Sequence, residues 1–286
     1  MYTRHWTSLM SFLHQHSLPD TLPIHQQHIA LFVTQLHNQG LRHTTIRTYI
    51  SAISFVHKLR GFPDNTSHFL INKAVKGASK RQLQSPRKLL PITKSLLHQM
   101  CDSLSIATPL VYNLIIYKSF FLTSFYACTR IGELALSNAD THTLTLQDVT
   151  QISHDTKPAI QLNFRSFKHS KSPVVTILQS IPSDPYCPVA ALNSYLCIRP
   201  VSASPYLFIQ QGGGGLTRND VSSMMKTCLQ CTGTDPTHYN THSFRIGRAT
   251  QLSLDKASDD TIKSVGRWKS TAYSSYIRPS HVTLPK

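Results

Sequence analysis

Apolar residues recur at helical spacing through most of this 286-residue chain, and alternation typical of strands occurs only in one short region. Residues 2–77 contain four such helical runs. The second run should end at Gly40, and the hydroxyls of Thr44 and Thr45 are candidates to cap the third. This pattern predicts an all-helical N-terminal domain over residues 1–84.

The charge of the chain is strongly unbalanced. Lys and Arg number 29 against 13 Asp and Glu, which gives +16, although charged residues are only 15% of the chain. The excess comes from a scarcity of acids, and Glu133 is the only glutamate. A chain this basic is typical of a protein with a polyanionic partner, nucleic acid or an anionic membrane. So few carboxylates count against a two-carboxylate hydrolase or an acid-rich magnesium site.

The most apolar stretch, residues 111–128, is interrupted by Asn113 and Lys118, so we predict a buried helix and no membrane span. The six cysteines are few and scattered, which indicates reduced thiols in an intracellular protein. One alternative stays open. Cysteines 228 and 231 with histidines 238 and 242 could form a zinc site, although the six-residue gap in the middle is short for a zinc finger.

A stretch without acids lies between Asp64 and Asp102 and carries seven Lys and Arg residues. Such a run is either a solvated tether or a strap along a phosphate backbone, and the charge of the whole chain favours the strap. We predict a basic linker over residues 85–92, followed by a second domain over residues 93–286. Candidate DNA contacts in this first part of the chain are Arg42, Arg47, Lys80, Arg81, Arg87 and Lys88.

The second domain should be mainly helical with a small antiparallel sheet. The three predicted strands lie near 143–150, 159–167 and 173–179, and a hairpin with Lys168 and Lys171 at its tip joins the last two. Helices are predicted over 93–104, 111–138, 187–198, 217–230, 242–254, 258–266 and 270–277.

Two short motifs combine an arginine with a polar partner three residues away. In C-T-R-I-G-E-L, Arg130 follows an apolar helical run, and Glu133 would share its helical face. In T-H-S-F-R-I-G-R, His242 and Arg245 would likewise share a face, which is a suitable arrangement for an anion. Taken singly, a structural ion pair and an ordinary polar helix face explain these motifs better.

A third motif, V-G-R-W-K-S-T-A-Y-S-S-Y-I-R, places Trp268 eight residues before Tyr276. In this order, and with the basic hairpin between the first two, the motifs resemble the tyrosine recombinases, the phage-integrase-like DNA strand-exchange enzymes. The wording of the second and third motifs most resembles the recombinases of eukaryotic DIRS-like and Ngaro-like retrotransposons. The resemblance implies a helical core-binding domain followed by a catalytic domain.

The resemblance also implies roles for five residues. Tyr276 would attack a DNA phosphodiester and hold a 3′-phosphotyrosyl bond while a 5′-hydroxyl leaves. Arg130 and Arg245 would hold the non-bridging oxygens as charge develops on them. His242 would add a hydrogen bond and take part in proton transfer. The indole N–H of Trp268 would donate to the phosphate.

Two further roles and two alternatives follow from the same resemblance. Lys168 would be the general acid for the leaving oxygen, with Lys171 as its rival, because hairpin tips tolerate slips of a few residues. Glu133 would orient the motif around its arginine. Tyr273 is the alternative nucleophile. Arg248 stands where the family usually has a small residue, so it would either crowd its helix or contact a phosphate.

Such an enzyme would need no metal, because cationic side chains stabilise the developing charge. It would need no ATP, because the covalent intermediate conserves the energy of the broken bond. Its partner would be double-stranded DNA, bound by a homotetramer on paired sites, with no membrane partner. A eukaryotic mobile-element origin would place it in the nucleus. Two other function classes remain: a DNA-binding relic without cleavage, and a relaxing topoisomerase of related chemistry.

Overall fold

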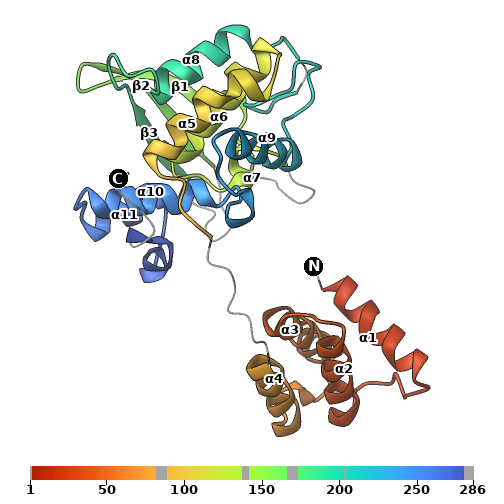
Figure 1. Cartoon of the computed structure of the whole chain (residues 1–286). Helices are drawn as coiled ribbons and strands as arrows, with labels where there is room; N and C mark the ends of the chain where they lie inside the picture. The colour runs from red at the N-terminus through yellow and green to blue at the C-terminus, as the bar shows by residue number, and fades with distance from the viewer. Residues whose placement is uncertain (1, 82–88, 137–141, 166–172, 203, 280–286) are drawn as a thin grey trace. The chain divides into compact units, whose positions relative to one another are not determined.

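The computed structural model describes residues 2–81, 89–136, 142–165, 173–202 and 204–279 (Figure 1). The chain forms two compact units, residues 1–87 and 88–286, called here the N-terminal and C-terminal units. No helix among the described ranges is both long enough and apolar enough to cross a membrane.

The N-terminal unit is all helical. Its elements are α1 (Thr3–Gln15), α2 (Gln26–Asn38), α3 (His43–Leu59), the 3-10 turn η1 (Asn65–Ser67) and α4 (Phe69–Arg81). Their apolar stripes meet in one core in which Leu9, Phe32, Ile46, Ile53 and Ile71 are almost fully buried. The apolar residues that recur at helical spacing in the sequence therefore form the buried face of each helix.

The turn between α2 and α3 explains why Thr44 and Thr45 do not cap. Gly40 ends α2 as predicted, at a φ of +80° that favours glycine. The next amide, that of Leu41, then bonds back to the Leu36 carbonyl at 3.1 Å. Because this turn is so tight, α3 begins at once, with Arg42 at the N-cap and no side-chain cap, so the prediction of hydroxyl caps was wrong.

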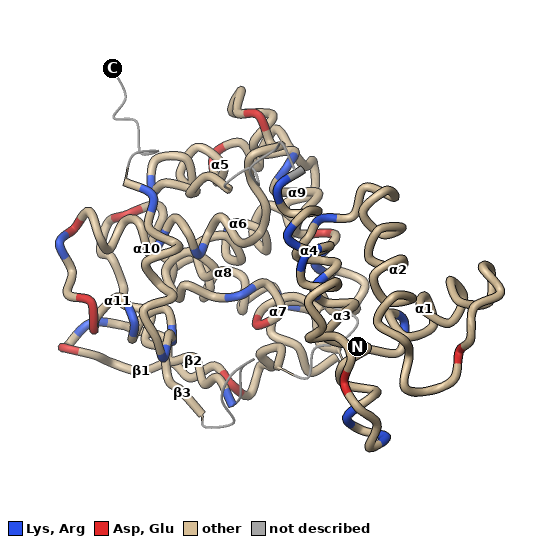
Figure 2. The backbone as a smooth tube through the Cα atoms, turned by 90° about the horizontal axis from the view of Figure 1, so that it is seen from below, with Lys and Arg blue, Asp and Glu red and all other residues tan. Residues whose placement is uncertain are grey.

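Helix α4 extends further into the acid-free stretch than the sequence predicts. It continues to Arg81 and contains no acidic residue, and Figure 2 shows blue cationic positions along it. Lys73, Lys76 and Lys80 are all exposed. Their spacing of three and four residues places them along one helical face, so much of the basic stretch is a helix surface.

The C-terminal unit combines helices with a three-stranded antiparallel sheet in the order β1-β2-β3. The strands are β1 (Val149–His154), β2 (Lys157–Phe164) and β3 (Val174–Gln179). The α-helices are α5 (Lys94–Ala107), α6 (Val111–Tyr126), α7 (Ile131–Leu134), α8 (Pro188–Ile198), α9 (Arg218–Cys231), α10 (Ser243–Leu254) and α11 (Asp259–Gly266). Three 3-10 turns complete the described part: η2 (Leu146–Asp148), η3 (Pro236–His238) and η4 (Thr271–Tyr276).

The apolar helix α6 lies at the centre of this unit. It packs against α5 on one side and α8 on another, and α8 in turn contacts β2 and β3 (Figure 1). Phe120, Phe121, Leu122 and Phe125 are fully buried in the core around it. Helix α10 also packs against α6, and it contacts α11 and η4. The C-terminal segments are thereby packed against the buried core of the unit.

The first strand begins six residues later than predicted. Residues 146–148 form η2 instead, because the Asp148 carboxylate accepts hydrogen bonds from both the amide and the hydroxyl of Thr145, at 2.9 and 2.7 Å. Asp155 and Thr156, both with positive φ, then turn the chain from β1 into β2.

The helix predicted over residues 111–138 is broken, and this break shapes the site. Helix α6 ends at Tyr126, and Cys128 adopts a left-handed φ of +50°. The Thr129 amide bonds back to the Ser124 carbonyl at 3.1 Å, which closes the helix end. Arg130 consequently stands at the start of a new turn, α7, and no longer on the long helix.

The segment that enters the C-terminal unit is bonded directly to the region of α10. The amides of Leu90 and Ile92 donate to the carbonyls of His238 and Ser243, at 3.0 and 3.1 Å. Ile92 is fully buried. A Cβ atom on Gly247 would lie 1.9 Å from the Ile92 carbonyl oxygen, so only glycine permits this approach. The last residues of the predicted linker thus pack as part of the C-terminal unit.

We expect Gly247→Ala to destabilise the chain by about 1–3 kcal/mol, because the added methyl group must push Ile92 away from α10. Gly77→Ala in α4 is the matched control. Nothing lies within 4 Å of a Cβ there, so this variant should gain about 0.5–1 kcal/mol from better helix propensity. Urea unfolding of both variants measures the difference, and equal effects would contradict the close-packing argument.

Candidate active site

A fully buried arginine organises the candidate site. Arg245 lies in α10 at 0% exposure, among the buried side chains Phe244, Ile246 and Ala249. A guanidinium in such a place needs partners, because burying an unpaired charge is costly. Arg245 donates to the carbonyls of Cys128 and Gly266, which belong to the turn after α6 and to the end of α11.

The turn around Cys128 is therefore held from α10. Besides accepting from Arg245 through its carbonyl, Cys128 donates its thiol to the Arg245 carbonyl, with 3.8 Å between sulfur and oxygen. Burial raises the pKa of this thiol, so it stays protonated and can act as the donor. This two-way contact fixes the backbone immediately before Arg130.

Arg130 and Glu133 form the predicted ion pair, but not on a helix face. The Arg130 guanidinium lies 3.0 Å from one carboxylate oxygen of Glu133, and the Arg130 amide donates to the other at 2.8 Å. Glu133 thus closes the first turn of α7. Its carboxylate is buried, whereas the side chain of Arg130 keeps 23% of its surface exposed. The guanidinium of Arg130 can therefore reach a ligand at the surface.

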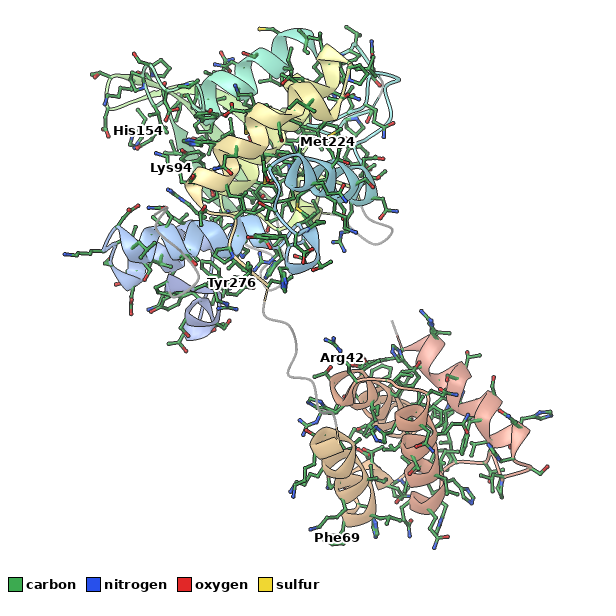
Figure 3. All side chains as sticks on the ribbon, in the orientation of Figure 1. Arg42, Phe69, Lys94, His154, Met224 and Tyr276 are labelled. Carbon is green, nitrogen blue, oxygen red and sulfur yellow. The ribbon has the colours of Figure 1, made fainter. Side chains whose placement is uncertain are left out.

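Three aromatic or imidazole rings gather beside Arg245. The half-buried ring of Tyr276 lies 4.9 Å from the Trp268 ring and 5.0 Å from the His242 ring, centroid to centroid. The Arg245 guanidinium carbon lies 4.2 Å from the Trp268 centroid and 5.6 Å from that of Tyr276. Figure 3 labels Tyr276 near α10 and α11. The structure therefore brings together four of the residues selected from the sequence.

The His242 imidazole is affected by the charges of both Arg245 and Arg130. Burial of the imidazole lowers its pKa to about 4, and the positive charges of Arg245 and then Arg130 contribute further. The imidazole is therefore neutral near pH 7 and can accept a proton. Its backbone is fixed by the Asn240 side chain, whose oxygen accepts from the His242 amide at 2.8 Å.

The close fit between the end of α11 and Trp268 depends on one glycine. A Cβ atom on Gly266 would lie 1.6 Å from the Trp268 ring, so the indole folds back against the bare backbone of this residue. This contact places the indole against both Arg245 and Tyr276.

Tyr273, the alternative nucleophile, lies in a different environment. Only 7% of it is exposed, and it packs with Leu252 and Ile262 in a small apolar cluster. A hydrogen bond with the Asp259 carboxylate raises the pKa of its hydroxyl, which makes Tyr273 a poorer nucleophile. It still contacts Trp268, at 6.4 Å between ring centroids.

The other predicted residues belong to the N-terminal unit or lie outside the described residues. Lys168 and Lys171 lie outside, as do Arg87 and Lys88. In the N-terminal unit, Arg42, Arg47 and Lys80 are exposed on α3 and α4 or at their ends, and Arg81 is the last residue of α4.

Arg248 packs against two aromatic side chains at the end of α6, and its predicted phosphate contact stays a prediction. Its guanidinium carbon stacks 5.4 Å from the centroid of Tyr126 and 5.9 Å from that of Phe125, and burial lowers its pKa.

Sequence reasoning missed Arg267, which is central to the site. Its side chain is 1% exposed and donates to Glu133 at 2.5 Å. It also adopts a left-handed φ of +55° at the end of α11. The sequence offered no signal for its burial beyond its place between Gly266 and Trp268 in the third motif.

The zinc alternative finds no support in the geometry. Within the described ranges, which include all four proposed ligands, no three His, Cys, Asp or Glu side chains are grouped so that they could hold a metal ion. Cys228 is instead buried beside Ser103, and burial raises the pKa of its thiol to about 11.

No protein-family model and no curated protein matches this sequence. Solved structures do match. One is the XerH site-specific recombinase bound to palindromic difH substrate, at a TM-score of 0.68 and 14% identity over 96% of this chain and 75% of that one. A lambda integrase dimer bound to a core site matches at a TM-score of 0.62 and 15% identity, over 99% and 73%. The Tn1549 transposon integrase in complex with circular intermediate DNA matches at 0.60 and 14%, over 95% and 87%.

The chain has the fold of the tyrosine recombinases. Its helical N-terminal unit corresponds to the core-binding domain of that fold, and its C-terminal unit with the small antiparallel sheet corresponds to the catalytic domain. The fold class predicted from the sequence is confirmed.

The lowered pKa of His242 makes the stability of the chain depend on pH. In the unfolded chain this imidazole titrates near 6.5, against about 4 in the folded chain. Between these values the unfolded state binds more protons, so the free energy of unfolding falls as the pH drops from 6.5 towards 4. Below pH 4 this residue has no further effect.

We expect this loss to be absent in His242→Gln. Between pH 7.5 and 4.5, the free energy of unfolding of the wild type should fall by on the order of 2 kcal/mol more than that of the variant. Urea unfolding at several pH values gives both curves. Parallel curves would show that His242 titrates normally in the folded chain.

Proposed function

We propose that this protein is a site-specific DNA recombinase that cleaves and rejoins DNA strands through a 3′-phosphotyrosyl intermediate. One observation carries the proposal: His242, Arg245 and Trp268 surround the half-buried ring of Tyr276. These are the residue types that phosphoryl transfer by a tyrosine needs, and they come from segments far apart in the sequence. The recombinase fold of the whole chain supports the same conclusion.

In the proposed reaction, the Tyr276 hydroxyl attacks the phosphorus of a DNA phosphodiester. The phenolic proton passes to a base, for which His242 is the candidate because its ring lies 5.0 Å from that of Tyr276. A phosphate bound beside it would offset the arginine charges that lower the pKa of this imidazole. The bond between phosphorus and the 5′ oxygen breaks, that oxygen takes up a proton, and the 3′ phosphate stays on the tyrosine. In rejoining, a 5′-hydroxyl attacks this phosphotyrosine, so no ATP is required.

The arginines stabilise charge in this scheme. Phosphoryl transfer gains chiefly from positioning and from cations directed at the oxygens where negative charge develops. Arg130 keeps an accessible guanidinium for this purpose, and Trp268 supplies an indole N–H. Two nitrogens of Arg245 already donate to the Cys128 and Gly266 carbonyls. A phosphate would be contacted through the remaining N–H groups of this guanidinium.

We assign the general acid to Lys168 and keep Lys171 as its alternative. In the sequence, both stand between the end of β2 and the start of β3. These two strands pair as far as Phe164 and Val174, and Phe164 belongs to the core of the C-terminal unit. Phe164, the last residue of β2, is buried against the guanidinium of Arg267. The β2 end of this hairpin is therefore anchored on Arg267, which also binds Glu133.

We further propose double-stranded DNA as the partner, with Arg42, Arg47, Lys80, Arg81, Arg87 and Lys88 contacting phosphates. The net charge of +16 supports this and predicts binding that weakens steeply with salt. The motif wording supports an origin in a DIRS-like or Ngaro-like retrotransposon, with mobile-element integration in the nucleus as the role. By the same resemblance the active form is a homotetramer on paired sites, and the reaction needs no metal.

Tyr276→Phe should abolish covalent attachment to DNA and leave binding within about twofold, because only the attacking oxygen is lost. Denaturing gels and mass spectrometry of digested complexes, on DNA from the chain's own genomic locus, detect the adduct. Tyr273→Phe is the control and should keep the adduct. An adduct that survives in Tyr276→Phe would show that another residue is the nucleophile. Salt-sensitive binding without any adduct in the wild type would favour a DNA-binding relic.

Lys168→Ala should slow cleavage of an ordinary phosphodiester by about 100-fold or more, because the leaving 5′ oxygen needs a proton. A 5′-phosphorothiolate leaves as a thiolate and needs none, so its cleavage should be nearly unaffected. Lys171→Ala is the matched control, with little effect on either substrate. The reverse result would assign the acid to Lys171, and equal slowing of both substrates would remove Lys168 from this role.

A further inference from the structure

The Arg267 side chain contacts residues of four segments of the C-terminal unit. Its Nη2 donates to the Glu133 carboxylate at 2.5 Å, and its Nη1 donates to the Ala127 carbonyl at 3.1 Å and to the Thr176 hydroxyl at 3.2 Å. Its guanidinium carbon lies 4.0 Å from the centroid of the Phe164 ring. These partners belong to α7, to the turn before Arg130, and to β3 and β2.

The backbone at Arg267 is as unusual as its side chain. A φ of +55° is one that glycine adopts easily and that a residue with a Cβ adopts only at a cost. Arg267 therefore has an unfavourable backbone conformation, and its charge is also buried, with only 1% of the side chain exposed. A buried ion pair by itself is weak evidence of stability, so these features favour a role in placing its partners.

The three residues 266–268 act together on the site. The Gly266 carbonyl accepts from Arg245, the Arg267 side chain holds Glu133, and the Trp268 ring lies against both Arg245 and Tyr276. A shift of Arg267 would therefore reach its neighbours on either side.

Charge balance gives Arg267 a second effect. Glu133 receives Arg130 on one carboxylate oxygen and Arg267 on the other, so one negative charge is shared between two guanidinium groups. This group of three carries a net charge of +1. Without Arg267 the same carboxylate would pair with Arg130 alone, and little net positive charge would remain to attract a phosphate.

We infer that Arg267 is a positioning residue for strand cleavage. It holds Glu133 so that the Arg130 guanidinium stays directed at the scissile phosphate, and it shares the charge of Glu133 so that Arg130 remains effectively cationic. This inference rests on the proposed recombinase function. Arg267 itself, at 1% side-chain exposure, does not touch DNA.

The test compares two DNA substrates that differ in one charge. A methylphosphonate at the scissile position replaces a charged non-bridging oxygen by a methyl group, which lowers the need for a cation there. Arg267→Gly, which also relieves the left-handed backbone, should slow adduct formation about 100-fold on the phosphodiester. On the methylphosphonate its rate should lie within about fivefold of the wild type. Arg267→Lys keeps the charge without the planar guanidinium, so its rate on the phosphodiester should lie between those of the wild type and Arg267→Gly.

Lys256→Gly is the matched control, because Lys256 is an exposed cation with a φ of +58° at the end of α10. It should keep rates within about twofold of the wild type on both substrates. An equal loss on both substrates for Arg267→Gly would show that Arg267 only stabilises the fold, and would overturn the inference.

Hydrogen exchange of the full chain, followed by mass spectrometry, separates this inference from the function on which it rests. In Arg267→Gly, amides in residues 127–135 should exchange at least about tenfold faster, because the Arg130 amide bonds to Glu133, while those of α9 should not change. Unchanged exchange at 127–135 would overturn the positioning role whatever the activity. Faster exchange combined with a wild type that binds DNA and forms no adduct would instead overturn the proposed function, and with it the role of Arg267 in cleavage.

Discussion

The buried guanidinium of Arg245 is the interaction on which the C-terminal unit depends. A fully buried cation must be satisfied by strong acceptors, and here the acceptors are backbone carbonyls of two chain reversals, at Cys128 and Gly266. Both reversals involve a left-handed residue that is not glycine, Cys128 itself and Arg267. The same contact thus satisfies the charge and fixes two strained turns, each of which carries residues of the candidate site.

The single glutamate has a matching role on the other side of the site. Its carboxylate is buried and lies between the guanidinium groups of Arg130 and Arg267. With Arg245, this makes three arginines and one acid in a region of low solvent access. Burial, together with the charges of Arg245 and Arg130, lowers the pKa of the His242 imidazole and keeps it neutral. The surplus of positive charge suits the region to an anion. A second acid here would halve that surplus, so the scarcity of glutamate in the chain matters at this site.

The sequence predicts most helices and the sheet correctly because their burial is periodic and local. The fully buried phenylalanines of α6 and the alternating burial of β2 follow directly from the pattern. The break after Tyr126 does not follow from it. The turn after the break is held by the hydrogen bond between the Cys128 carbonyl and Arg245, 117 positions further along the chain. No local rule contains that information.

The same limit applies to the site. Motifs identify Arg130, His242, Arg245, Trp268 and Tyr276, and the structure brings the last four together, yet Arg267 stands inside one of these motifs and was given no role. A left-handed backbone conformation is usually found at glycine, and a charged side chain is usually found at the surface. Both rules fail at one residue because Glu133, Phe164 and Thr176 together repay the backbone conformation and the lost hydration. Where two local rules fail at the same residue and tertiary contacts account for both, the residue is best explained by what it holds in place.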